Sequence, residues 1–318
     1  MNDTTAIQPD LLDPEIRRFV DGLNEGYAKF PDFGRLPLAE RRRAAEQVRT
    51  PWRSGGPRMH RSEELHIAGR RARVHVPSET GNLPALLYLH GGGWVMFSID
   101  THDRLMREYA ARAGIVVIGL DYSLAPEVRF PVALDEAVAA VDWMSRAGQA
   151  HGIDPKRLAL GGDSAGANLA TGAALRLRDR GDTPLRALLL NYGVYSPEPT
   201  PSYDLYDGPR YMLNVEEMRY FWESYVRHPS DLRNPLAAPL LADLAGLPPA
   251  LLSVGNCDIL ADSNRAMAAK LEAAGVPTEL RVYEGASHSF LEAMSISTLA
   301  NGALDDAAHW LRARLAPR

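Results

Sequence analysis

Residues 158–170, LALGGDSAGANLA, pass from a short apolar run through glycines to small residues that favour a helix. The centre of this stretch, Gly162-x-Ser164-x-Gly166, has the pattern of a nucleophile elbow, a sharp turn that joins a strand to a helix and exposes a serine. The two glycines let neighbouring backbone approach the turn without a Cβ clash, and the helix N-terminus favours an oxyanion nearby. The pattern predicts a nucleophilic serine; the competing interpretation is a glycine-rich turn in some other α/β protein.

Composition and charge narrow the classes of function. The chain of 318 residues is long enough for one large α/β domain or two small ones, and its hydrophobic fraction of 46% supports a sizeable core. A formal net charge of -5 argues against a nucleic-acid partner bound through a basic surface. No stretch reaches the roughly 18 apolar residues of a membrane span, and the first residues lack the basic start and apolar run of a signal peptide. We therefore expect a cytoplasmic protein.

Apolar runs alternate with amphipathic segments along most of the chain. Strands are predicted over residues 63–67, 71–76, 84–90, 115–120, 158–160, 185–192, 250–254 and 279–283. Helices are predicted over residues 101–113, 131–147, from the serine to about 180, 263–274 and 296–315. The first two strands suit an antiparallel hairpin at a sheet edge. The alternation of the others predicts a mostly parallel sheet covered by helices on both faces.

Two stretches do not fit this alternation. Residues 1–55 carry predicted helices at 14–23 and 38–48, followed by a Pro/Gly-rich linker at 51–57. Residues 196–235 contain several prolines and a predicted helix at 215–226, and are too long for a tight connection. The first stretch is interpreted as an accessory element, with its run of three arginines on a solvated helix face, and the second as an insertion over the sheet.

A serine hydroxyl becomes a nucleophile only when a base takes its proton, and a carboxylate must hold that base in the right tautomer. In proteins with such an elbow, the acid and then the histidine follow the serine, each after a strand. Of the histidines after Ser164, His228 lies in the insertion and His309 inside the last predicted helix. Only His288 directly follows a predicted strand. The topology therefore predicts that His288 is the base.

The acid is expected after the strand at residues 250–254. Asp258 lies in that loop, and Asp262 follows four residues later at the start of a predicted helix. Aspartate is a preferred N-cap residue, so Asp262 has an alternative role as a helix cap. Asp258 is therefore the preferred acid.

An acyl-transfer site also needs N–H donors for the oxyanion of its tetrahedral intermediate. Residues 90–94, HGGGW, follow an early predicted strand, at the position where such enzymes carry an oxyanion loop. Three consecutive glycines can turn their amides toward a substrate, although a merely flexible loop is the simpler interpretation. The predicted donors are the backbone N–H groups of Gly92, Gly93 and Ala165.

With HGGGW at residues 90–94, GDSAG at 162–166 and DYSLAPE at 121–127, the sequence from about residue 60 to its end resembles the hormone-sensitive-lipase-like family of bacterial esterases. The resemblance implies an α/β-hydrolase fold: a mostly parallel central sheet flanked by helices, with a helical cap. The core would comprise residues 56–195 and 236–318, and the cap residues 1–55 and 196–235. Two positions depart from the family pattern, Ile259 in place of a proline and Ala167 in place of a glycine; neither removes a reacting group.

The same resemblance implies supporting roles for Glu127 and Asp163, and we assign His90 and Gly91 to the same group. It also implies a small ester with a short acyl chain, acetyl to hexanoyl, as substrate. Candidate pocket residues are Trp94, Tyr211 and Trp222. The simpler interpretation is that the aromatic side chains of the cap only pack against other parts of the cap. An amidase or arylacetamide-deacetylase-like hydrolase is the nearest alternative. A non-catalytic small-molecule receptor on this fold is more distant, because such receptors lose the histidine.

No metal or cofactor is expected. The remaining histidines show no ligand spacing, and no Gly-x-Gly-x-x-Gly pattern follows a strand. The sequence leaves the oligomeric state open, with a homodimer as one possibility.

Overall fold

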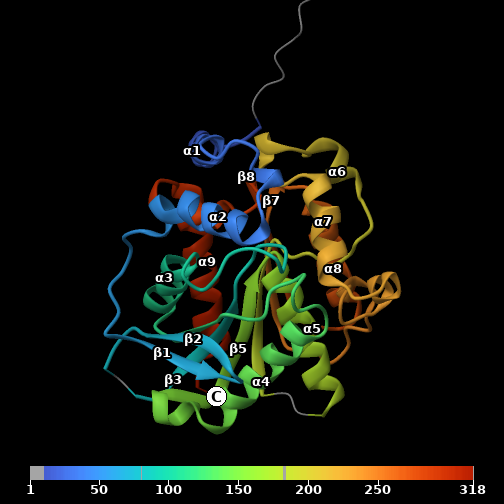
Figure 1. The fold of residues 1–318 in the computed structure, drawn as a ribbon. Coiled ribbons are helices and arrows are strands. Elements are labelled where there is room, and N and C mark those ends of the chain that lie inside the picture. Colours follow the sequence, from blue (N-terminus) through green and yellow to red (C-terminus); the bar gives the residue numbers. More distant parts are fainter. Residues whose placement is uncertain (1–10, 80, 182–183, 318) are drawn as a thin grey trace, which may run out of the picture.

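An eight-stranded sheet forms the centre of the computed structural model, which describes residues 11–79, 81–181 and 184–317 (Figure 1). Its strands are β1 (Arg61–Ile67), β2 (Arg70–Val76), β3 (Leu83–Leu89), β4 (Val116–Leu120), β5 (Ile153–Asp163), β6 (Leu185–Asn191), β7 (Ala250–Cys257) and β8 (Thr278–Ser287). They lie in the order β1-β2-β4-β3-β5-β6-β7-β8. The hairpin of β1 and β2 is antiparallel and at the edge, as predicted, and all pairs from β4 to β8 are parallel.

Both faces of this sheet are covered by helices. The covering helices are α3 (Asp103–Ala113), α4 (Val132–Arg146), α5 (Ala165–Asp179), α8 (Ala261–Ala273) and α9 (Thr298–Arg314). Successive residues of β3 enter opposite cores: Leu86 belongs to the core that contains residues of α3 and α9, and Leu87 belongs to the core that contains residues of α4, α5 and α8. A strand buried on both sides needs apolar residues at every position, which explains the continuous apolar runs of the sequence.

At one edge of the sheet, the predicted strands end too early in the sequence. β5, β7 and β8 extend to Asp163, Cys257 and Ser287, so these strands continue to the residues of the site. The linker predicted at residues 51–57 is partly wrong, because helix α2 (Leu38–Arg53) runs through the first part of it. Trp52 packs edge-on against Phe19, with ring centroids 4.8 Å apart, and this contact supports the last helical turn.

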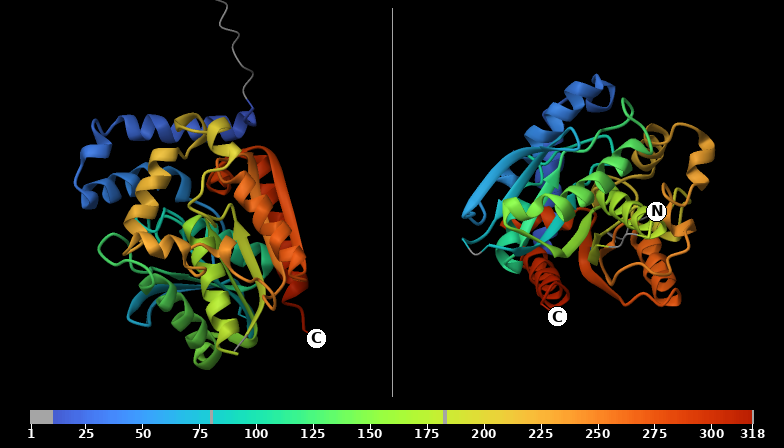
Figure 2. Two further views of the ribbon diagram at one scale, coloured as in Figure 1. Left: turned by 90° about the vertical axis from the view of Figure 1, so that its right-hand side faces the viewer. Right: turned by 90° about the horizontal axis from the view of Figure 1, so that it is seen from below.

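The two stretches that do not fit the alternation come together above the sheet. They form α1 (Pro14–Ala28), α2, α6 (Pro201–Leu205) and α7 (Val215–Tyr225) at the top of Figure 1 and of the left view of Figure 2. Asn24 and Arg17 of α1 donate side-chain hydrogen bonds to the carbonyls of Pro209 and Arg210. Residues 11–55 and 196–235 are therefore neighbours in space, and we call them the cap segments; residues 1–10 lie outside the described residues.

The run of three arginines at residues 41–43 of α2 was expected on one solvated face, but the structure shows that the three side chains do not share such a face. Arg43 is exposed, but the Arg42 guanidinium donates to the carbonyls of Val95 and Ala125 and contacts both carboxylate oxygens of Glu127 at 2.8 Å. Arg42 therefore joins a cap segment to two loops of the core. The reason is tertiary: this side of α2 packs on the core, not on solvent.

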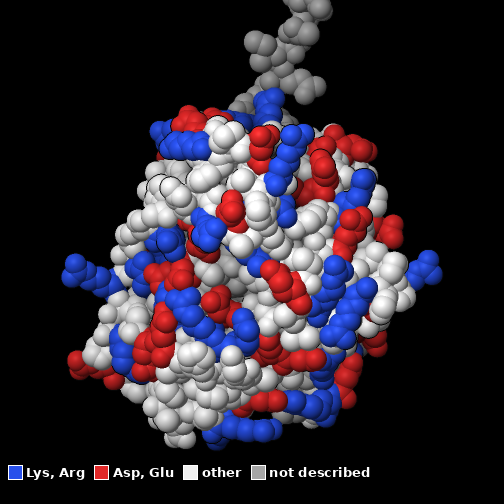
Figure 3. Space-filling view, in the orientation of Figure 1, with Lys and Arg blue, Asp and Glu red and all other residues white. Residues whose placement is uncertain are grey.

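Acidic and basic side chains are interspersed on the face shown in Figure 3. Part of this pattern is a network on the sheet edge in which Arg71 and Arg73 both contact Asp100 and Glu64. None of the helices in the described part of the chain combines the length and apolar character that crossing a membrane requires.

Candidate active site

Ser164 occupies the turn between β5 and α5 in a conformation that L-residues rarely adopt, with φ 52° and ψ -118°. A non-glycine residue in such a region costs on the order of 1–3 kcal/mol, so the surrounding structure must enforce it. The turn is enforced by close packing, since a Cβ at Gly162 or Gly166 would collide with the carbonyl of Leu89 on β3. The elbow predicted from the sequence is therefore present, with the serine at its apex.

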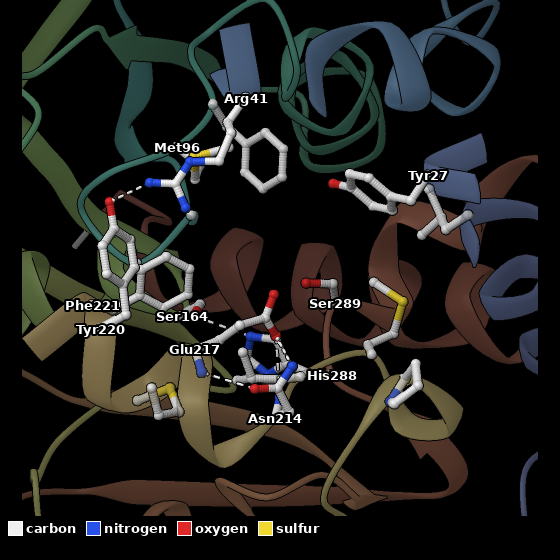
Figure 4. Close-up of a pocket in the computed structure, with 18 of the residues that line it drawn as sticks. Tyr27, Arg41, Met96, Ser164, Asn214, Glu217, Tyr220, Phe221, His288 and Ser289 are labelled. Carbon is white, nitrogen blue, oxygen red and sulfur yellow. Dashed lines mark hydrogen bonds between the residues drawn. The ribbon is translucent and has the colours of Figure 1, made fainter. Parts of the chain in front are cut away.

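His288 and Asp258 meet Ser164 at the same edge of the sheet. The Nε2 atom of His288 lies 3.0 Å from the Ser164 hydroxyl, and its Nδ1 atom lies 2.8 Å from Oδ2 of Asp258. Parallel strands end at one edge, so the segments after β5, β7 and β8 bring these three residues together from distant parts of the chain. All three are buried, and Figure 4 shows Ser164 and His288 facing the same space.

The two candidate acids have different surroundings. The second oxygen of Asp258, Oδ1, accepts the backbone N–H of Leu260, which orients the carboxylate. Asp262 instead accepts the backbone N–H of Ser202 and pairs with Arg265. Asp262 is the second residue of α8, so it is not the N-cap that the sequence suggested. The structure therefore brings Asp258, and not Asp262, against His288.

The environment of His288 favours its charged form. Burial opposes protonation of this ring, but the charge of Asp258 and the hydrogen bond to it outweigh burial and raise the pKa of His288 above 6.5. Because the carboxylate accepts the Nδ1 proton, Nε2 is left to accept the hydroxyl proton of Ser164. The geometry is that of a serine activated by an oriented base.

The glycine-rich loop lies beside the serine. Gly92 and Gly93 have φ values of 116° and 59°, and both line the same cavity as Ser164. Neither amide donates a hydrogen bond within the described part of the chain. Ala165 is the first residue of α5, where the backbone N–H has no intrahelical acceptor. Three N–H groups near Ser164 are thus available to an oxyanion.

A buried polar network underlies this loop. The Asp163 carboxylate accepts hydrogen bonds from the Tyr88 hydroxyl at 2.9 Å and the Gly91 amide at 3.1 Å, and lies 3.4 Å from Nε2 of His102. Burial acts to raise the pKa of Asp163, but the charge of His102 and the hydrogen bonds from His102 and Tyr88, together with the charge of His90, outweigh burial and lower it. No role for His102 could be predicted from the sequence, because its partner Asp163 is 61 positions away.

His90 and Glu127, the other residues expected to support the site, make different contacts. The His90 ring stacks on the Tyr122 ring, with centroids 4.3 Å apart, and the Tyr122 hydroxyl donates a hydrogen bond to the backbone carbonyl of His90. These contacts hold the start of the glycine loop. Glu127 is more than half exposed and binds Arg42, so it joins the cap to the core at a distance from the serine.

A cavity of about 240 Å³ opens onto Ser164 and His288 (Figure 4). The core contributes the glycine loop and Trp94, as predicted for Trp94. The cap segments contribute Leu23, Asn24, Tyr27, Phe33, Arg41, Arg49, Pro209, Met212, Leu213, Asn214, Glu217, Met218, Tyr220 and Phe221. Most of these were missed, because helical periodicity does not tell which face of α2 or α7 meets the core.

Tyr211 and Trp222, the other predicted pocket residues, lie outside this cavity. Trp222 points into the hydrophobic core, where its ring lies 4.8 Å from Trp94. Tyr211 packs edge-on against Tyr206 at 5.3 Å. The alternative interpretation, that cap aromatics serve packing and not the pocket, holds for these two side chains, because each packs against other aromatic rings. Among the described residues, no group of three or more His, Cys, Asp or Glu side chains could hold a metal ion.

Comparisons with known proteins agree with this geometry. A family model described as alpha/beta hydrolase fold matches residues 86–292. An acetyl esterase of Salmonella choleraesuis (strain SC-B67) is 36% identical over 248 residues, which cover 76% of this chain and 76% of that protein. The solved esterase of Pyrobaculum calidifontis has a TM-score of 0.88 at 33% identity and covers 95% of this chain and 98% of its own. A thermostable carboxylesterase cloned from a metagenomic library has a TM-score of 0.86 at 35% identity, over 89% of this chain and 99% of its own.

Proposed function

This chain belongs to the α/β-hydrolase family, with the hormone-sensitive-lipase-like esterases, and is a carboxylic-ester hydrolase; we propose that Ser164, His288 and Asp258 carry its reaction. The observation that supports these roles is the continuous hydrogen-bonded series from the Ser164 hydroxyl through His288 to Asp258, at 3.0 and 2.8 Å. The same series argues against a receptor that only binds its ligand.

In the first half of the reaction, Oγ of Ser164 attacks the ester carbonyl carbon while Nε2 of His288 takes the hydroxyl proton. The carbonyl oxygen becomes an oxyanion, which accepts hydrogen bonds from the amides of Gly92, Gly93 and Ala165. Asp258 remains ionised and stabilises the imidazolium. His288 then donates its proton to the departing alkoxide, so the alcohol leaves and an acyl-enzyme remains on Ser164.

In the second half, a water molecule attacks the acyl carbon and gives a proton to Nε2 of His288. The second oxyanion uses the same three amides. Collapse of this intermediate breaks the bond to Oγ, and His288 returns the proton to Ser164. The products are one carboxylic acid and one alcohol for each ester and water consumed.

We assign the cap role to residues 1–55 and 196–235, whose described parts supply most of the cavity wall. A cavity of about 240 Å³ beneath such a cover favours short acyl chains, acetyl to hexanoyl. A series of p-nitrophenyl esters of increasing chain length tests this preference, and a maximum at long chains would contradict it. The cytoplasmic location stays a prediction, which cell fractionation tests.

The catalytic role is tested with Ser164→Ala and p-nitrophenyl acetate. We expect a loss that approaches a millionfold in kcat, as for other serine hydrolases. Ser145→Ala, on α4 and remote from the cavity, is the matched control and keeps wild-type activity. A fluorophosphonate probe should label Ser164 in the wild-type protein and not in Ser164→Ala. Activity retained by Ser164→Ala would refute the assignment. An anilide of acetic acid, assayed in parallel, compares amide with ester cleavage.

A further inference from the structure

Arg41, near the start of α2, lines the cavity that contains Ser164. Its guanidinium carbon lies 4.9 Å from the centre of the Tyr220 ring, and its Nη2 donates to the Tyr220 hydroxyl at 2.7 Å. Its Nε is buried and has no hydrogen-bond acceptor. Figure 4 shows Arg41 and Tyr220 on one side of the cavity, across from Tyr27. A cap segment therefore places an arginine in the wall of the cavity that contains Ser164.

The neighbouring arginines have their charges compensated. Arg42 binds the Glu127 carboxylate, and Arg49, the other arginine of the cavity wall, lies 3.2 Å from Glu292 and donates to the Tyr27 hydroxyl. Within the described part of the chain, no carboxylate lies at ion-pair distance from Arg41. Its hydrogen-bond partner, Tyr220, is a neutral hydroxyl. Arg41 is thus a cation without a counter-charge.

One acidic side chain, Glu217, lines the same cavity, and its contacts are local. Its carboxylate accepts hydrogen bonds from the backbone N–H of Asn214 at 3.2 Å and from Nδ2 of Asn214 at 2.7 Å. Burial raises the pKa of Glu217. Of the two arginines that line the cavity, Arg49 is paired with Glu292, whereas Arg41 has no carboxylate at ion-pair distance among the described residues.

We propose that Arg41 binds a carboxylate that the ester substrate carries at the end remote from the scissile carbonyl. The inference rests on the proposed esterase function and adds a substrate class to it: short esters that are also carboxylic acids. A guanidinium matches a carboxylate in shape and charge, and its hydrogen bonds to an anion are stronger than those to a neutral acceptor. The carboxylate would provide the counter-charge that the guanidinium lacks among the described residues.

The carboxylate could belong to the acyl part or to the alcohol part of the substrate, and two matched substrate pairs distinguish these cases. Monomethyl glutarate against methyl hexanoate tests the acyl side. 3-Acetoxypropanoate against butyl acetate tests the alcohol side. Hydrolysis is followed at constant pH near 8, where both carboxylic acids are ionised. The readout is the ratio of kcat/KM for the charged ester to kcat/KM for its neutral partner.

The variants are Arg41→Ala and Arg41→Lys, with Arg43→Ala as the control, an exposed arginine two positions along the same helix. For at least one pair, Arg41→Ala should lower the ratio by roughly 10- to 100-fold, the usual size of a charged hydrogen bond, mainly through KM. Arg41→Lys should give an intermediate ratio, because it keeps the charge and loses the planar geometry. Arg43→Ala should leave the ratio unchanged.

The outcomes separate this inference from the proposed function. If wild-type protein hydrolyses the neutral esters but Arg41→Ala changes neither ratio, or lowers charged and neutral rates equally, the inference is wrong and the esterase function stands. If wild-type protein hydrolyses no ester at all, the proposed function fails and the inference fails with it. Thermal unfolding checks that the variants fold; if Arg41→Ala does not, the ratio of Arg41→Lys decides.

Discussion

The core and the cap contribute to the same cavity in different ways. The core supplies Ser164, His288 and Asp258 from the ends of parallel strands, buried and joined by hydrogen bonds of 2.8–3.0 Å. The cap segments supply side chains from helices and loops, such as Arg41 and Phe221. The reacting groups are thus held by sheet register, whereas the groups that meet the substrate depend on how two distant segments pack. Changes to the core should stop the reaction, and changes to the cap should alter selectivity or stability.

After the loss already expected for Ser164→Ala, the largest effect is expected for Asp258→Asn. The amide can still hydrogen-bond to His288, but it favours the wrong tautomer and removes the charge that stabilises the imidazolium. We expect kcat to fall by roughly 10⁴-fold. The matched control is Asp262→Asn, which changes the other acid of this segment and leaves His288 untouched. Steady-state hydrolysis of p-nitrophenyl acetate measures both; equal losses would mean that the two acids cannot be distinguished.

The next largest effect is expected for a substitution at Gly93, where the core meets the cap. Gly93 has φ 59°, and a Cβ on it would overlap the ring of Phe221 in α7. Gly93→Ala should therefore displace an oxyanion donor and lower kcat by roughly 10²- to 10³-fold.

Two further variants separate collision from backbone strain. Gly114→Ala places a Cβ at a similar φ of 66° with no neighbouring atom within 4 Å, and should affect stability without affecting kcat. Adding Phe221→Ala to Gly93→Ala removes the collision and should restore part of kcat. If the double variant is no better than Gly93→Ala, contact with the cap is not the cause.

The pH dependence of kcat/KM should reflect the interaction between Asp258 and His288. Activity requires neutral His288, so kcat/KM falls as pH drops through the pKa of this ring. Because the net effect of burial and Asp258 is to raise the pKa of His288, the acid limb should lie above the ordinary value of 6.5. In Asp258→Asn, the residual kcat/KM should fall at a lower pH than in the wild type, because the charge that raises the pKa of His288 is gone. His309→Gln is the control and should not move it. A wild-type limb at or below 6.5 would contradict this assignment.

The smallest effect is expected where the cap is joined to the core by Arg42 and Glu127. Glu127→Gln removes only an ion pair whose carboxylate is more than half exposed, which costs about 0.2–1 kcal/mol of unfolding free energy. Arg42→Ala also removes hydrogen bonds to two backbone carbonyls and should cost about 1–2 kcal/mol. Urea unfolding measures both against Arg43→Ala, which should resemble wild type. A larger loss for Glu127→Gln than for Arg42→Ala would reverse this interpretation.

Much of the fold could be predicted because its signals are local. The burial of Ile16, Phe19, Val20 and Leu23 in α1 follows from helical spacing, and α3 ends at Gly114, which has the positive φ expected of a helix terminator. The order of serine, aspartate and histidine, which follow β5, β7 and β8, indicated the proposed reacting groups without any knowledge of distances. In contrast, His102 and Arg49 gave no sequence signal, because each has its partner on a distant element.

The sequence by itself determined the sheet, the elbow and the order of the reacting residues, because strand periodicity, turn chemistry and chain order are properties of neighbouring residues. Only the tertiary structure decided that Arg41 lines the cavity, Arg42 joins the core and Arg43 faces solvent. Three identical residues in succession look alike in a sequence. Helical spacing separates their directions, but what each direction meets depends on how α2 packs against the core loops and α7, which come from distant parts of the chain.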